Sequence, residues 1–308
     1  MVDEFVRCGV TDAVLSPGSR STPLAIALAQ AEARGELTLH VRLDERTAGY
    51  LAIGIAKVTG VPAIVVTTSG TAAVNLHPAI VEADQAGIPM IAITADRPPQ
   101  LRGVGANQTI GQPGLFGPAV RLSLDMATAE EREGFVRYWR STVARVIAAS
   151  TDAVHPGPVH VNVPFAEPLV PGAGGEWIED LDGRPDGRPW TADARLVAGM
   201  STPLDDVLDA LLDDHKVPAR GIVVIGDHDD TEAVELADEL SDALGWPVIA
   251  EPSGNGAGCT TALSHGPLLL ADAAFAEAHV PDVVVTIGRV GLNRSELRMI
   301  GRAGLHVA

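Results

Sequence analysis

Short apolar runs alternate with longer amphipathic segments along the first half of the chain, and turn residues stand at each junction. The runs read as strands are residues 13–15, 38–42, 63–67, 90–94 and 158–163. The segments between them have helical spacing, at residues 22–34, 45–58, 71–86 and 128–150. Repeated strand–helix units build a mostly parallel sheet with helices on both faces. We therefore predict a doubly wound α/β fold for this part.

A second group of strands follows a segment rich in proline, glycine and aspartate, which sustains neither a helix nor a central strand. The runs GIVVIGD (221–227) and PDVVVTIGR (281–289) are β-branched, and a predicted helix (231–244) and strand (247–250) lie between them. These patterns predict a second, Rossmann-like α/β domain. No closing helix follows the final AGLHVA, so we expect this domain to be truncated. The predicted organisation is a first domain at 1–170, a linker at 171–192 and a second domain at 193–308.

Composition and charge exclude several classes of function. The chain has 22 Lys and Arg against 40 Asp and Glu, a formal net charge of −18, which argues against nucleic-acid and anionic-membrane binding. No segment is apolar enough for a membrane span, and the N-terminal MVDEFVRCGV does not resemble a signal peptide. Cys8 and Cys259 are remote in sequence and favour a reducing compartment. We expect a cytoplasmic protein that binds anionic ligands through local arginines.

Several catalytic motifs are missing from the sequence. Both lysines precede valine, which excludes a GxxxxGK[ST] phosphate loop, and no GxSxG, CxxC or HExxH occurs. GNGAG at 254–258 lacks the GxGxxG spacing and is interpreted as a flexible connection. DHDD at 227–230 is interpreted as a helix N-cap, and the pair His155 and His160 is left unassigned. No metal ligand is therefore assigned.

Three short loops after strands carry small polar or charged residues. In SPGSRSTPL (16–24), the turn and Arg20 can hold a carboxylate, or the segment is only a capped helix start. LDERTAGY (43–50) places Asp44 and Glu45 in a first helical turn, where the helix dipole favours acids in any case. In TSGTAAVN (68–75), Ser69 and Thr71 are candidates for helix capping or for ligand contact.

The fourth loop, residues 95–117, is long and rich in glycine and proline, and it carries two arginines, an asparagine and glutamines. Long loops of this kind are commonly functional. Ligands of open α/β sheets bind beyond the carboxyl ends of the strands, so the four loops should converge on one crevice. The residues alone predict a polar, arginine-bearing anion site and leave the reaction open.

Five segments together resemble the MenD family of thiamine diphosphate-dependent synthases: SPGSRSTPL, LDERTAGYLAIGIAK, TSGTAAVNLHPAIVEA, TADRPPQLRGVGANQTI and HVNVPFAEPL. The resemblance spans residues 1–170 and continues more weakly to the end. It implies a pyrimidine-binding first domain, thiamine diphosphate and Mg²⁺ or Mn²⁺ as cofactors, and a transferase of menaquinone biosynthesis. The implied reaction decarboxylates 2-oxoglutarate and adds the succinyl unit to isochorismate, giving 2-succinyl-5-enolpyruvyl-6-hydroxy-3-cyclohexene-1-carboxylate.

The resemblance also implies roles for individual residues. Glu45 matches the family carboxylate that hydrogen-bonds the aminopyrimidine ring of the cofactor and favours its imino tautomer. Ser69 and Thr71 are assigned to cofactor binding. Arg294 in GLNRSE is a looser match to a basic substrate site, whose neighbouring basic position is Asn293 here. The other substrate-contacting positions, where arginine forks suit carboxylates, match at Ser19, Arg20, Arg97, Asn107 and Gln108.

Family members carry a third, C-terminal domain whose GDG…N motif holds the metal and the diphosphate. The 308 residues contain no such motif, since GDH at 226–228 lacks the second glycine. We therefore expect this chain to be the N-terminal portion of a synthase, inactive by itself and without metal ligands. The family binds its cofactor between two subunits, which implies a homodimer or tetramer for the complete protein.

Three other functions remain open at this point. Another thiamine diphosphate-dependent 2-oxo-acid synthase or decarboxylase would share Glu45 but need not share ADRPPQLRGVGANQ. A non-catalytic binding protein would keep the anion crevice without the cofactor domain. A nicotinamide-dependent dehydrogenase is suggested by the fold class alone, and the lack of GxGxxG argues against it.

Overall fold

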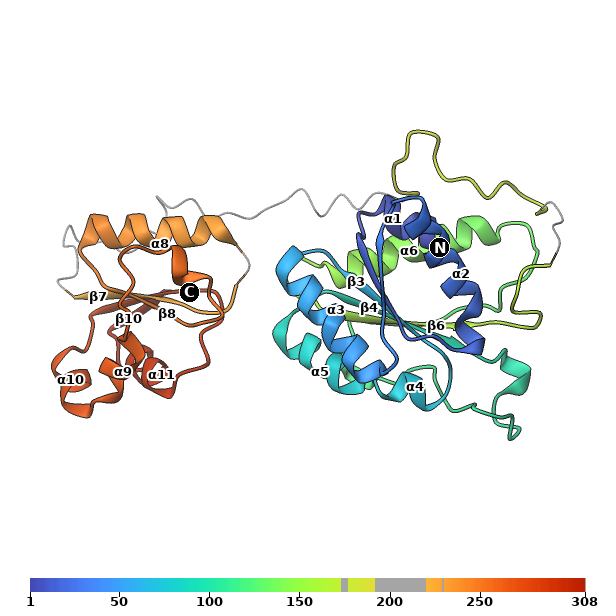
Figure 1. Cartoon of the computed structure of the whole chain (residues 1–308). Helices are drawn as coiled ribbons and strands as arrows, with labels where there is room; N and C mark the ends of the chain where they lie inside the picture. Colours follow the sequence, from blue (N-terminus) through green and yellow to red (C-terminus); the bar gives the residue numbers. More distant parts are fainter. Residues whose placement is uncertain (173–176, 192–219, 229, 308) are drawn as a thin grey trace. The chain divides into compact units, whose positions relative to one another are not determined.

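The computed structural model describes residues 1–172, 177–191, 220–228 and 230–307. The chain divides into two compact units, Met1–Gly199 and Met200–Ala308. Each unit contains its own parallel sheet with helices on both faces (Figure 1). The α/β class predicted from the sequence is therefore confirmed for both units.

The sheet of the first unit has the strand order β2-β1-β3-β4-β6-β5. Five strands were predicted to within two residues at each end, and β5 was missed because its four residues lie at a sheet edge and carry a short mixed pattern. From β1 the chain runs outward to β2 and then returns past β1 to β3, so the direction of winding reverses between β1 and β3. The strands are β1 (Asp12–Leu15), β2 (Thr38–Val41), β3 (Ala63–Thr67), β4 (Met90–Asp96), β5 (Leu122–Asp125) and β6 (Pro158–Pro164).

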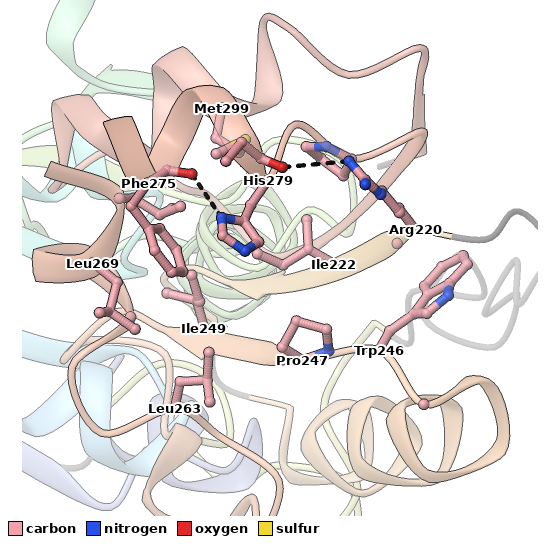
Figure 2. Close-up of a pocket in the computed structure, with 16 residues that line it drawn as sticks. Arg220, Ile222, Trp246, Pro247, Ile249, Leu263, Leu269, Phe275, His279 and Met299 are labelled. Atoms are coloured by element: carbon pink, nitrogen blue, oxygen red, sulfur yellow. Dashed lines mark hydrogen bonds between the residues drawn. The ribbon is translucent and has the colours of Figure 1, made fainter. Parts of the chain in front are cut away.

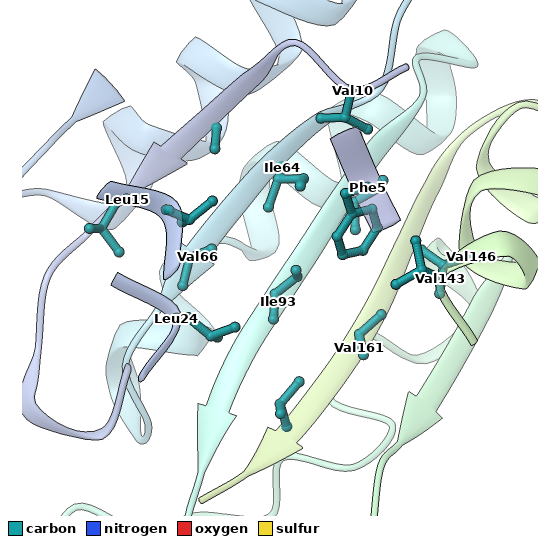
Figure 3. Close-up of a cluster of buried hydrophobic side chains, with 14 of the residues drawn as sticks. Phe5, Val10, Leu15, Leu24, Ile64, Val66, Ile93, Val143, Val146 and Val161 are labelled. Carbon is teal, nitrogen blue, oxygen red and sulfur yellow. The ribbon is translucent and has the colours of Figure 1, made fainter. Parts of the chain in front are cut away.

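Alternate residues of these strands build two separate apolar cores, because successive side chains of a strand point to opposite faces. Ile64 and Val66 face one core, and Val65 between them faces the other. Figure 3 shows the first core, where Phe5, Leu24 and Val143 pack over the strands. The helices of this core are α1 (Val2–Arg7), α2 (Thr22–Ala33) and α6 (Phe135–Ser150), and those of the other are α3 (Glu45–Thr59) and α5 (His77–Ala86).

Two helix predictions in this unit were wrong in extent. The predicted helix 71–86 is two helices, α4 (Thr71–Val74) and α5, because Pro78 stands in the first turn of α5 and cannot continue a preceding helix. The predicted helix 128–150 begins only at Phe135. Gly134 directly before it has φ of 89°, a left-handed conformation that glycine adopts without steric cost.

The second unit has the strand order β10-β9-β7-β8, again all parallel. The predicted strands and α8 (Thr231–Leu244) are confirmed, and AGLHVA contains the short strand β10. Three short helices, α9 (Gly266–Ala271), α10 (Ala273–Ala278) and α11 (Arg294–Ile300), were not predicted. They lie on the face opposite α8 (Figure 1). The strands are β7 (Gly221–Ile225), β8 (Val248–Ala250), β9 (Val283–Ile287) and β10 (Leu305–Val307).

Described residues of the predicted linker pack onto the first unit. The buried Arg140 of α6 donates hydrogen bonds to Asp3 (2.7 Å), Glu4 (2.5 Å) and the carbonyl oxygen of Leu181 (2.7 Å). The backbone N–H of Trp190 donates to Glu4 (2.5 Å). The acids of α1 thus tie this segment to α6. The domain boundary at 171–192 stays a prediction.

Both cysteines are free thiols, Cys8 half-buried and Cys259 buried. Among the helices of the described residues, none is long and apolar enough to cross a lipid bilayer.

We predict that Leu28→Ala destabilises the first unit by about 2–5 kcal/mol, because Leu28 is 1% exposed in the core between α2 and the sheet. Val58→Ala is the matched control, since Val58 is 88% exposed on α3 and its truncation should change the stability by less than about 0.5 kcal/mol. Urea unfolding followed by circular dichroism measures both. Equal losses in the two variants would contradict this packing.

Candidate functional site

The loops that follow β1, β3 and β4 meet at the carboxyl edge of the first sheet. A Cβ atom on Gly18, after β1, would lie 2.5 Å from the Cβ of Thr68, after β3. A Cβ on Gly70 would lie 2.9 Å from the side chain of Gln108, and Gly70 has φ of 80°. Glycine at both positions therefore permits the close approach of the loops. This is the point where the winding reverses, which is where open α/β sheets bind ligands.

Arg97, directly after β4, connects two of these loops. Its guanidinium donates hydrogen bonds to the hydroxyl of Ser69 and to the carbonyl oxygen of Gln108, the latter at 2.9 Å. The amide of Gln108 donates in turn to the carbonyl oxygen of Ser69 at 3.0 Å. The structure thus brings together three residues that are up to 39 positions apart in the sequence and that were predicted as site residues.

Arg20 supplies a second guanidinium close to Arg97. It is 8% exposed and donates to the carbonyl oxygen of Phe165, after β6, at 2.9 Å. It also pairs with Glu167 at 3.6 Å, while its Nε is buried and has no hydrogen-bond partner among the described residues. Burial of Arg97 and the positive charge of Arg20 hold the pKa of Arg97 below its ordinary value. Two cations held this close favour the binding of an anion between them.

Glu45 is the first residue of α3, and its carboxylate does not cap the helix. The cap is Asp44, whose side chain accepts a hydrogen bond from the backbone N–H of Thr47 at 2.8 Å. The half-buried Glu45 instead accepts from the amide of Asn75 at 3.5 Å. Asn75, just after α4, is a neighbour that the sequence reasoning missed. A carboxylate not used in capping fits the acceptor that an aminopyrimidine ring needs.

The capping interpretations of the loops at 16–24 and 68–75 were wrong. The N-cap of α4 is Gly70, and the N-cap of α2 is Ser21, and neither makes a side-chain capping hydrogen bond. Thr71 is the exposed first residue of α4. Ser19, the first residue of the 3₁₀ turn η1 (Ser19–Ser21), and Asn107, in the loop after β4, are also exposed. Their assignments to ligand binding remain predictions.

Arg294 belongs to the second unit. It is the exposed first residue of α11, directly after Asn293. Its contribution to the site of the first unit stays a prediction.

A fully buried polar side chain, Gln112, holds the long loop against the sheet. Its Oε1 accepts from the backbone N–H of Gly70 at 2.8 Å. Its Nε2 donates to Asn162 Oδ1 at 2.9 Å and to the carbonyl oxygen of Ala95 at 3.1 Å. One side chain thereby joins the turn after β3, the end of β4 and the middle of β6. Gln112 was not predicted as a functional residue, although its loop was.

Asn162 connects the hydrogen bonds of Gln112 to a group of charged side chains. Its Nδ2 donates to Asp96 (2.9 Å) and to Asp125 (2.8 Å), and Arg102 makes a bidentate pair with Asp125 at 2.7 and 2.9 Å. Burial alone would raise the pKa of Asp125, but the hydrogen bonds from Arg102 and Asn162 outweigh it and lower that pKa. The signal available in the sequence was the presence of polar residues inside apolar strands.

His160, on β6, is fully buried. Its ring nitrogen Nε2 forms a hydrogen bond of 2.8 Å with the hydroxyl of Thr94. Its ring meets Phe116 edge-on, with centroids 4.7 Å apart. Burial lowers the pKa of His160 to about 4, against a smaller opposing effect of Asp125. His160 is therefore neutral at pH 7. His155 is exposed, and within the described part of the chain no group of three or more His, Cys, Asp or Glu side chains can hold a metal ion.

A cavity of about 330 Å³ lies in the second unit, at the amino ends of β7 and β8. Figure 2 shows it between Trp246 and Pro247 on one side and Phe275 and His279 on the other. None of the predicted site residues lines it. Because parallel sheets bind ligands at the carboxyl ends of their strands, the candidate site is the loop cluster of the first unit.

A comparison with known protein families indicates which class of protein has this loop cluster. Residues 1–115 match the family model described as thiamine pyrophosphate enzyme, N-terminal TPP binding domain. Residues 1–115 include the loops after β1, β2 and β3 and nearly all of the loop after β4. This part of the first unit therefore matches the N-terminal domain of thiamine pyrophosphate enzymes.

Relatives extend the likeness over nearly the whole chain. Proteins named 2-succinyl-5-enolpyruvyl-6-hydroxy-3-cyclohexene-1-carboxylate synthase are similar in Thermobifida fusca (48% identity, covering 100% of this chain and 53% of the relative) and Saccharopolyspora erythraea (47%, covering 94% and 50%). The relative in Kineococcus radiotolerans is 42% identical, covering 98% of this chain and 52% of its own length. The chain belongs to this MenD family, and it spans about half the length of these relatives.

We predict that the first unit loses stability as the pH falls from 6.5 to 4 and that His160→Gln reduces this loss. The pKa of His160 in the folded chain lies below its ordinary value of 6.5. As the pH falls through this range, the unfolded chain binds a proton at this histidine before the folded chain does, which favours unfolding. The contribution is up to about 3 kcal/mol, at about 1.4 kcal/mol for each unit of pKa. Urea unfolding at several pH values gives the slopes. His155→Gln, at an exposed histidine, should keep the wild-type slope, and a wild-type slope in His160→Gln would contradict the prediction.

Proposed function

We propose that this chain forms part of a synthase that makes 2-succinyl-5-enolpyruvyl-6-hydroxy-3-cyclohexene-1-carboxylate from isochorismate and 2-oxoglutarate in menaquinone biosynthesis. The observation that carries the proposal is the pairing of Arg97 and Arg20 at the carboxyl edge of the first sheet, in a chain 47–48% identical to proteins named for this product. Both proposed substrates are carboxylic acids, and the guanidinium groups of the buried Arg20 and the half-buried Arg97 suit such anions.

Glu45 is the proposed catalytic residue. Thiamine diphosphate, when bound, supplies the electron sink that decarboxylation of a 2-oxo acid requires. Glu45 would hold a proton at a ring nitrogen of the aminopyrimidine, and Asn75 would fix the orientation of the Glu45 carboxylate through the contact at 3.5 Å. Ser69 and Thr71, in the turn after β3, are the further proposed cofactor contacts.

Arg97 and Arg20 would bind the substrate carboxylates, and Ser69 and Gln108 would orient Arg97 through the hydrogen bonds described above. A guanidinium held by neighbouring oxygens loses less conformational entropy when it binds an anion. Ser19, Asn107 and Arg294 are the remaining proposed substrate contacts.

The diphosphate and its Mg²⁺ or Mn²⁺ would be held outside the described residues, in a part of the complete enzyme beyond this chain. We also propose a cytoplasmic homodimer or tetramer that binds no nucleic acid. Support for a covered surface comes from exposed apolar side chains on the elements around Glu45, namely Val41 (51%), Leu43 (87%), Tyr50 (41%) and Val74 (40%).

The full-length enzyme, loaded with thiamine diphosphate and Mg²⁺, should form the predicted product from 2-oxoglutarate and isochorismate, as measured by mass spectrometry. Release of carbon dioxide from pyruvate with no reaction of isochorismate would point to a different 2-oxo-acid enzyme of the same class. The failure of both reactions would overturn the proposed function.

Glu45→Gln in the full-length enzyme should lower kcat by about 100-fold or more, because a positioned proton donor or acceptor contributes about 10²–10⁴ to a rate. Steady-state kinetics measures kcat, and circular dichroism checks that the fold is intact. Glu82→Gln, on the exposed surface of α5, is the matched control and should retain wild-type kcat. A kcat near the wild-type value in Glu45→Gln would remove Glu45 from the catalytic role.

Arg97→Lys should weaken the binding of at least one of the two carboxylate substrates and raise its KM by about 10-fold, since lysine keeps the charge but loses the bidentate fork. The effect on kcat should be smaller than that of Glu45→Gln. Arg132→Lys, whose side chain is 70% exposed, is the control. Unchanged KM values for both substrates in Arg97→Lys would exclude the proposed carboxylate contact.

A further inference from the structure

The carboxylate of Glu251 lies in the interior of the second unit. Glu251 directly follows β8 and is 2% exposed. Its oxygens accept hydrogen bonds from the backbone N–H groups of three consecutive residues: Gly291 (3.1 and 3.2 Å), Leu292 (2.6 Å) and Asn293 (3.3 Å). These residues form the loop between β9 and α11. A single side chain therefore fixes the course of that loop against the end of β8.

A second buried carboxyl group, Glu296, stands beside the first. Glu296 belongs to α11 and is 0% exposed. Its Oε1 accepts from the side-chain amide of Asn293 at 3.3 Å, whereas its buried Oε2 has no hydrogen-bond partner within the part of the chain that the structure describes. Asn293 bonds to both carboxyl groups, because its backbone N–H donates to Glu251 and its side-chain amide donates to Glu296. Two ionised carboxylates held side by side in a buried site repel each other, so the arrangement favours a proton on one of them.

The surroundings decide which carboxyl group carries the proton. Glu251 receives hydrogen bonds from three backbone N–H donors. Glu296 receives one amide donor and is buried against a negative charge. Burial and then the neighbouring Glu251 raise the pKa of Glu296 to about 7. Glu296 is therefore the protonated partner below neutral pH.

The other charged groups near the pair lie on the elements that pack around it. Arg289 precedes the loop, and Arg294 and Arg298 belong to α11 itself. Helix α9, which packs against α11, has the sequence GPLLLA with no titratable side chain, and His265 is its N-cap. Of these groups, Glu251 is the one whose charge shifts the pKa of Glu296.

We propose that Glu251 and Glu296 share one proton, and that this proton latches the loop 288–293 and the start of α11 onto the end of β8. Loss of the proton leaves two negative charges in contact in a buried site, which weakens the latch. Arg294, at the start of α11, then changes its position with pH around neutrality. This inference goes beyond the proposed function and does not depend on it, because both carboxyl groups lie within the second unit.

The latch makes the stability of the second unit depend on pH in a defined direction. In the unfolded chain Glu296 ionises near its ordinary value of 4.5, whereas in the folded chain its pKa is about 7. The folded state therefore holds one more proton between these two values. The stabilisation is complete below pH 4.5 and is lost as the pH rises to 7.

A carbon-13 NMR titration of the 308-residue chain, labelled at glutamate side-chain carboxyl carbons, tests the proposal. Glu296→Gln identifies the Glu296 signal by its disappearance. In the wild-type chain this signal should titrate near pH 7, and the backbone amide signals of Gly291 and Leu292 should shift with the same midpoint. A Glu296 signal that titrates near its ordinary 4.5 would overturn the proposal.

The same variant supplies a second readout, because glutamine keeps the size of the side chain and a hydrogen-bond donor but does not titrate. In Glu296→Gln the pH-dependent shift of the Gly291 and Leu292 amides near pH 7 should be lost. Glu235→Gln, at an exposed glutamate of α8, is the matched control and should keep the wild-type shift. An unchanged shift in Glu296→Gln would show that another group controls the loop. If that variant does not fold, the wild-type amide signals of Gly291 and Leu292 still decide, because the lack of a shift near pH 7 would overturn the proposal.

Discussion

The hydrogen bonds of one buried amide, Gln112, are the interaction on which the site of the first unit depends. They join the turn after β3, the end of β4 and the middle of β6, three segments that the chain supplies at widely separated positions. A buried amide with unsatisfied partners would destabilise the fold by about 1–3 kcal/mol for each lost partner, so the three contacts select a single arrangement of the loop. The position of Arg97 on this loop follows from that arrangement.

Both units place carboxylates at the carboxyl edge of a parallel sheet, and each compensates their charge in its own way. In the first unit, Asp96 and Asp125 are matched by Arg102 and by the amide of Asn162. In the second unit, no cation contacts Glu251 and Glu296 among the hydrogen bonds and ion pairs of the described residues, and backbone N–H groups and a shared proton replace it. The second arrangement responds to pH near neutrality.

Much of the fold was predictable because strand and helix periodicity are local properties of the sequence. The central strands have continuous apolar runs, and every one of them was located within two residues. Edge strand β5 and helices α9 to α11 are too short to carry a period of their own, and their positions come from packing. Pro78 and Gly134 were visible in the sequence, yet their effect on helix limits was overlooked.

The sequence by itself determined the fold class, the four loops that hold candidate ligand residues and the resemblance to the MenD family. Only the tertiary structure decided that Asp44 caps α3 and leaves Glu45 available, and that Ser69, Arg97 and Gln108 are in contact. Only the structure revealed Gln112, Asn162 and the pair of Glu251 and Glu296 as buried polar groups. The physical reason is that burial and hydrogen-bond partners depend on which strands become neighbours, and that information is not contained in any single segment of the chain.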